Sequence, residues 1–142
     1  METKFNFKSQ ICTDRNQSER LLALGIKKET ADMVWLDFAL TGDYDDWRVV
    51  VIYKDWEDWQ KYGFPAWSLH RLIEMMPESI HKHNDIADLS VSNELVQYRF
   101  YDVDYNHDVC LEHFNDGTLY NNIIDCIDWL IKEGYFNKEY LV

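Results

Sequence analysis

The fold is decided by residues 95–134, which read LVQYRFYDVDYNHDVCLEHFNDGTLYNNIIDCIDWLIKEG. Two runs with alternating side chains come first, at residues 95–101 and 108–114, and the first run places Val96 and Tyr98 on the same face. Alternation with a period of two is typical of a strand that buries one face. The intervening residues are rich in Asp and Asn, which favour turns. The two runs are therefore predicted to form a β-hairpin.

The register of this hairpin follows from the position of its tip. With the tip at residues 104–107, Arg99 is predicted to lie opposite Glu112 on the outer face, where opposite charges stabilise the pairing modestly. Val109 and Leu111 are then predicted to point inward.

The strongest helix signal lies at the C-terminal end of this stretch. Asp116 to Thr118 begins the predicted helix and Gly134 ends it. Its broad apolar face consists of Leu119, Ile123, Ile124, Ile127, Leu130 and Ile131. Cys126 lies near this face, so its thiol is predicted to be an inert part of the core.

Further elements are predicted upstream of the hairpin. They are a helix at 18–24, a helical turn at 28–32, strands at 34–40 and 48–53, a helix after Pro65 that Pro77 ends, and a short strand at 87–91. Residues 48–53 are so rich in β-branched side chains that both faces of that strand are expected to be covered. Pro65 is assigned to the first position of its helix, where a missing N–H is harmless. The buried stripe of that helix is predicted to be Leu69, Leu72, Ile73 and Met76.

Together these elements predict the fold class. The short links between strands favour antiparallel pairing. The chain is expected to be a single α+β domain over residues 1–142. It would be a mostly antiparallel β-sheet of about five strands, with about three helices packed mainly on one face.

Composition excludes several kinds of partner. Lys and Arg number 14 against 26 Asp and Glu, a formal net charge of −12. Such a surface repels nucleic-acid phosphates and anionic lipids, so neither direct nucleic-acid binding nor membrane binding is expected, and a partner with a basic surface suits the charge better. The three cysteines, Cys12, Cys110 and Cys126, lack metal or disulfide spacing, and the N-terminal residues lack the apolar core of a secretion signal. A cytoplasmic protein with reduced thiols is expected.

The predicted hairpin tip resembles the start of a calcium loop, because Asp102, Asp104 and Asn106 alternate as oxygen ligands do. A complete loop needs Gly at its sixth position and Glu at its twelfth, where this chain has His107 and His113. A solvated hairpin tip is therefore the preferred interpretation.

Other chemistry-bearing residues also lack a complete motif. Asp43, Asp45 and Asp46 form an acidic cluster in a predicted loop, and His81 and His83 have the spacing of two zinc ligands. Loop aspartates in an acidic protein are usually solvated, and zinc needs a third ligand that no motif supplies. No catalytic, cofactor-binding or metal-ligating residue is predicted.

The most unusual feature is a dense group of aromatic side chains framed by charges. Its members are Trp56, Trp59, Tyr62, Phe64 and Trp67. Trp and Tyr dominate the energetics of protein interfaces, so this aromatic group is a candidate interaction patch. The alternative is that the rings form a lid over one end of the sheet, as satellite cores do. A homodimer contact would satisfy both interpretations.

Four short motifs carry a resemblance to a known family. They are Leu-Leu-Ala-Leu-Gly at 21–25, Thr-Ala-Asp-Met at 30–33, Pro-Ala-Trp-Ser-Leu at 65–69 and Trp-Leu-Ile-Lys-Glu-Gly-Tyr at 129–135. In this order they resemble a family of small uncharacterised proteins of phage-like and other mobile elements in anaerobic gut bacteria. The resemblance implies a cytoplasmic accessory protein of a mobile element, and it brings no activity, cofactor or site residues.

The sequence thus favours a non-enzymatic binding or accessory protein that acts through protein–protein contacts, with an unknown protein or a second copy as its partner. One alternative is an acidic decoy that imitates DNA, for which carboxylates must be arrayed at phosphate-like spacing. Another is a small metal-dependent hydrolase that uses Asp102, Asp104 and His107, or the histidine pair.

Overall fold

The computed structural model describes residues 9–37, 47–52 and 63–142. Its elements are α1 (Arg15–Ala23), η1 (Lys28–Thr30), β1 (Met33–Asp37), β2 (Trp47–Val51), β3 (Gly63–Ala66), α2 (Leu69–Met75), β4 (Ser79–Lys82), β5 (Asp85–Ser92), β6 (Leu95–Asp102), β7 (His107–Phe114), α3 (Leu119–Glu133) and η3 (Lys138–Tyr140). The predicted α+β class is confirmed. The described strands form two antiparallel sheets, however, and β3 and β4 are absent from the sequence prediction.

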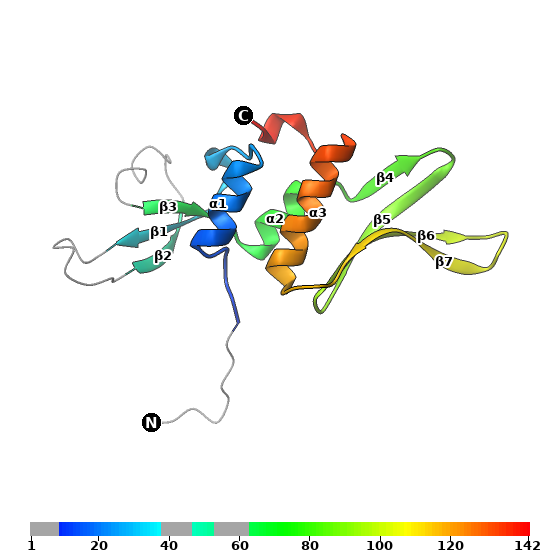
Figure 1. The fold of residues 1–142 in the computed structure, drawn as a ribbon, viewed down its shortest axis with the longest axis horizontal. Helices are drawn as coiled ribbons and strands as arrows, with labels where there is room; N and C mark the ends of the chain where they lie inside the picture. The colour runs from blue at the N-terminus through cyan, green and yellow to red at the C-terminus, as the bar shows by residue number, and fades with distance from the viewer. Residues whose placement is uncertain (1–8, 38–46, 53–62) are drawn as a thin grey trace, which may run out of the picture.

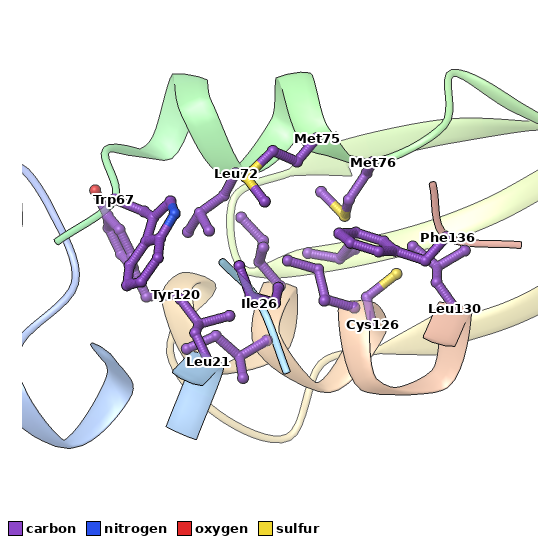
Figure 2. Packing of buried hydrophobic residues seen from close by; sticks show 14 of the residues in the cluster. Leu21, Ile26, Trp67, Leu72, Met75, Met76, Tyr120, Cys126, Leu130 and Phe136 are labelled. Carbon is purple, nitrogen blue, oxygen red and sulfur yellow. The ribbon is translucent and has the colours of Figure 1, made fainter. Parts of the chain in front are cut away.

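The two sheets lie at opposite ends of the molecule, and the helices occupy the space between them (Figure 1). The smaller sheet has the order β2-β1-β3 and the larger has the order β4-β5-β6-β7. The core lies mainly between the larger sheet and the helices (Figure 2). Its fully buried large side chains include Tyr98 of β6, Leu72 of α2 and Ile127 of α3.

The assignment of Pro65 to a helix is wrong, because Pro65 lies in β3, opposite Val34 of β1. A proline cannot donate to a sheet ladder, but β3 is at the edge of its sheet, where this is tolerated. Helix α2 begins later, at Leu69, after its N-cap Ser68, whose hydroxyl accepts a hydrogen bond from the Arg71 N–H at 3.2 Å. The predicted stop before Pro77 is confirmed.

The expectation that both faces of residues 48–53 are covered is also wrong. Strand β2 pairs with β1 and lies at the edge of the smaller sheet, and Val51 is 60% exposed. The β-branched run therefore reflects strand propensity rather than burial. The antiparallel pairing of β1 with β2 is confirmed, whereas residues 38–40 and the acidic cluster at residues 43–46 lie outside the described residues.

The β6–β7 hairpin forms, but its register differs from the prediction. Asp102 pairs with His107, and an irregularity at Tyr98 and Arg99 shifts the ladder, so that Arg99 lies opposite Cys110. The predicted pairing of Arg99 with Glu112 is therefore wrong. A β-bulge inserts one unpaired residue, which alternation alone does not reveal.

Helix α3 matches its prediction closely. Thr118 caps the N-terminus, and Gly134 ends the helix with a φ of 80°, a left-handed conformation that glycine adopts without strain. Most of the predicted apolar face is buried, with Leu119 and Ile131 partly buried at its edges, and Cys126 lies within the core as expected (Figure 2).

Candidate functional site

An aromatic cluster lies on one face of the smaller sheet. Each strand contributes one ring: Trp35 from β1, Trp47 from β2 and Phe64 from β3. Because Trp35 is directly opposite Phe64 in the ladder, their side chains share a face, and the two ring centroids are 6.3 Å apart. The ring of Trp47 is 5.5 Å from that of Phe64. The pairing of three strands is therefore what assembles the cluster.

Arg15, the first residue of α1, completes the arrangement. Its guanidinium carbon is 4.8 Å from the ring centroid of Trp47 and 4.7 Å from that of Phe64. At such distances a cation is attracted to the negative faces of aromatic rings, an interaction of about 0.5–1 kcal/mol at exposed sites. The arginine is thereby held in one place by two rings, although its side chain is exposed.

Hydrogen bonds attach the start of α1 to the smaller sheet. The indole N–H of Trp35 donates to the carbonyl of Thr13 at 2.9 Å. The Asp14 carboxylate caps α1 by accepting a hydrogen bond from the Gln17 backbone N–H. In turn, the side-chain oxygen of Gln17 accepts a hydrogen bond from the Asp14 backbone N–H at 3.0 Å. The position of Arg15 is thus set by a capping box on one side and by the aromatic rings on the other.

The result is a cleft of about 320 Å³, lined by Asp14, Arg15, Trp35, Trp47 and Phe64. The three rings are half-buried, and the two charged residues stand exposed at the rim. We call this feature the aromatic cleft. Its lining can stack against a planar or apolar side chain and can make charge-assisted hydrogen bonds at its rim.

The structure divides the aromatic group that the sequence singled out. Phe64 lies in the aromatic cleft, whereas Trp67 is fully buried in the core (Figure 2). The indole N–H of Trp67 donates to the Thr30 hydroxyl at 2.9 Å. Trp67 therefore offers no surface to a partner. Trp56, Trp59 and Tyr62 lie outside the described residues, so their part in a patch stays a prediction.

The predicted calcium-like segment forms the tip of the β6–β7 hairpin. The carboxylate of Asp102 accepts hydrogen bonds from the N–H groups of Asp104, at 3.0 Å, and Tyr105, at 3.4 Å. This is the turn chemistry that the solvated-tip interpretation expects. Within residues 9–37, 47–52 and 63–142, no three His, Cys, Asp or Glu side chains are grouped as a metal ion would need.

All three cysteines are free thiols. Burial raises the pKa of Cys12 to about 11 and that of Cys126 to about 12, with smaller contributions from nearby carboxylates. Desolvation, together with the Glu112 carboxylate, also raises the pKa of the exposed Cys110. A nucleophilic cysteine needs a lowered pKa, so these thiols lack the reactivity of a catalytic group at neutral pH.

No family model, curated protein or solved structure matches the chain. Among the described helices, none has the length and apolar character needed to cross a membrane. The geometry of the surface is therefore what indicates a function for the chain.

Proposed function

We propose that the chain is a non-enzymatic accessory protein that binds another protein through the aromatic cleft. The observation that carries this proposal is the exposed guanidinium of Arg15 stacked over the half-buried rings of Trp47 and Phe64. Arginine and tryptophan are the residues most enriched among those that dominate binding energy at interfaces. An apolar or aromatic side chain of the partner would fill the cleft.

The cleft is also well prepared for binding. An arginine that is already held in place loses less rotamer freedom when a partner docks, which lowers the entropic cost of association. The overall charge of −12 favours a partner whose docking surface is basic around its apolar anchor. The three free thiols and the resemblance to mobile-element proteins support an accessory role in the cytoplasm.

A DNA-imitating decoy has less support. It would need carboxylates arrayed along one face, and three of them, Asp108, Asp125 and Asp128, already pair with a basic side chain and are less available for such an array. Among the residues that the structure describes, no cluster of ligands favours a metal-dependent hydrolase.

The proposal is tested by comparing partner capture among variants of the whole chain. Arg15→Ala and Trp47→Ala remove cleft side chains, and Arg20→Ala is the matched control, because Arg20 lies on the same helix but pairs with Asp125. The wild type and each variant are used to capture proteins from native cells. Any protein that the wild type and Arg20→Ala capture, and that both cleft variants lose, is then purified and titrated directly. We expect binding to weaken by about tenfold or more for each cleft variant, the loss typical of an interface anchor.

Each variant's solution mass is measured beside these titrations to report its oligomeric state. Near-ultraviolet circular dichroism reports whether the variant keeps the packing of its aromatic side chains. If the captured partner is a second copy, light scattering shows a dimer that Arg15→Ala dissociates. Purified partners that bind both cleft variants as tightly as the wild type would remove the basis of the proposal.

A further inference from the structure

The tip of the β6–β7 hairpin lies at the end of the larger sheet that is remote from the helices (Figure 1), and it carries exposed apolar side chains. Val103 is 80% exposed and Tyr105 is 74% exposed at the tip of the β6–β7 hairpin. Tyr101 of β6 and Ile86 of β5 are each more than half exposed beside them. We call these four residues the hairpin patch. Large apolar side chains clustered at a protein's surface, away from its core, mark an interaction site.

Local contacts restrain the two tyrosines of the hairpin patch. The hydroxyl of Tyr101 donates to the side-chain oxygen of Asn106, and the ring of Tyr105 is 6.0 Å from that of His107 in an edge arrangement. The Asp102 carboxylate fixes the turn between them. A partner would therefore meet two tyrosine rings whose positions are already restrained, which lowers the entropic cost of binding.

Beside the tip, the sheet carries a hollow of about 340 Å³. Ile86 and Tyr101 form its apolar walls, and Asp88 and Asp108 line it together with Arg99. The Arg99 guanidinium is 3.6 Å from the Asp108 carboxylate, so the one basic side chain among the described residues that line the hollow is already paired. The hollow can accept an apolar side chain, and its remaining charge favours a cation.

The charge of the whole sheet points to the same kind of partner. Residues 79–114 contain seven acidic side chains and two basic ones. The acidic residues are Asp85, Asp88, Glu94, Asp102, Asp104, Asp108 and Glu112, and the basic ones are Lys82 and Arg99. Such a field attracts basic segments, repels phosphate backbones and opposes contact with a second copy of the same surface.

We infer that the hairpin patch binds a basic segment of a partner protein, in which apolar side chains cover Tyr101, Val103 and Tyr105 and lysine or arginine side chains meet the surrounding carboxylates. This surface is separate from the aromatic cleft, which belongs to the smaller sheet.

The test uses a short labelled peptide in which lysine alternates with valine and tyrosine, and a counterpart with glutamate in place of lysine. The basic peptide is titrated into the full chain and followed by fluorescence anisotropy and by backbone amide shifts. We expect shifts concentrated at residues 99–108, and binding about tenfold weaker in the double variant Val103→Ser/Tyr105→Ser, which removes both exposed anchors. Asp104→Lys should also weaken binding, more so at low salt.

Two matched controls address non-specific attraction. Ile11→Ser/Val142→Ser removes two exposed apolar side chains outside the sheet, and Glu133→Lys reverses an exposed charge on α3. Both should bind the peptide as the wild type does. The inference fails if no binding is seen at millimolar peptide, if the controls weaken binding equally, or if the acidic peptide binds as well. A concentration-dependent dimer that Val103→Ser/Tyr105→Ser abolishes would also overturn it, because the occupant would then be a second copy.

Discussion

Asn122 is a fully buried polar residue whose replacement gives a sharp test of the packing between α3 and the larger sheet. Its side-chain amide donates to the carbonyl of Glu94, at 2.7 Å, and to that of Gly117, at 2.9 Å. Its side-chain oxygen accepts from the Gly117 N–H at 2.9 Å. Asn122 thus joins the start of α3 to the turn between β5 and β6 and to the loop that precedes the helix.

The expected loss follows from these three bonds. Each buried hydrogen bond contributes about 1 kcal/mol net, so Asn122→Ala should lower the free energy of unfolding by about 3 kcal/mol. The neighbouring Asn121 loses only one such bond when changed to Ala, that from the Gln17 amide at 2.9 Å. Asn121→Ala should therefore lower the free energy of unfolding by about 1 kcal/mol or less, because alanine also favours the helix slightly. The two variants change composition identically, so their difference isolates burial.

The assay is urea unfolding followed by tryptophan fluorescence and far-ultraviolet circular dichroism. With a urea dependence of about 2 kcal/mol per molar, the midpoint should fall by about 1.5 M for Asn122→Ala and by about 0.5 M or less for Asn121→Ala. Hydrogen exchange at the Gly117 amide should also become faster in Asn122→Ala alone. Equal midpoints for the two variants would refute the reasoning.

Three further changes test the caps and the buried thiols. Asp14→Ala removes the capping box of α1 and should cost about 1 kcal/mol in urea unfolding, whereas Asp14→Asn should restore most of it. Gly134→Ala places a Cβ at a φ of 80° and should lower the melting temperature by about 4 °C, with no loss expected if that conformation carried no strain. The pKa is raised to about 11 for Cys12 and to about 12 for Cys126, so the folded state holds these protons more tightly than the unfolded state does. The free energy of unfolding should therefore keep its full value below pH 9. Above pH 9 it should fall by up to about 1.4 kcal/mol per pH unit for each thiol. Urea unfolding at several alkaline pH values should show this decline, and Cys126→Ala should make it shallower; a flat profile would contradict it.

The prediction of helices from sequence succeeded where the signal is local. Thr118 is a start signal and the left-handed Gly134 is a stop signal, and each lies directly at the end of α3 that it defines. The apolar spacing of α3 then predicted its buried face. Such signals need no knowledge of the rest of the chain.

The aromatic cleft was only partly predictable. Phe64 drew attention because it belongs to an aromatic-rich segment, whereas Trp35 and Trp47 are isolated in the sequence. They meet Phe64 only because β1 pairs with both β2 and β3. Strand β3 is short and contains Pro65, so its residues do not show the pattern of a strand. The pairing of β1 with β3, which assembles the cleft, was therefore not predicted.

The ends of α3, the turn of the β6–β7 hairpin and the buried face of β6 follow from the amino-acid sequence, because they depend on side chains a few positions apart. The division into two sheets, the bulge that moves Arg99 opposite Cys110 and the stacking of Arg15 on two rings depend on segments distant along the chain. Backbone hydrogen bonds between strands do not depend on which side chains the residues carry, so many registers are locally acceptable. The packing of the whole chain selects one of them, and with it the surface available to a partner.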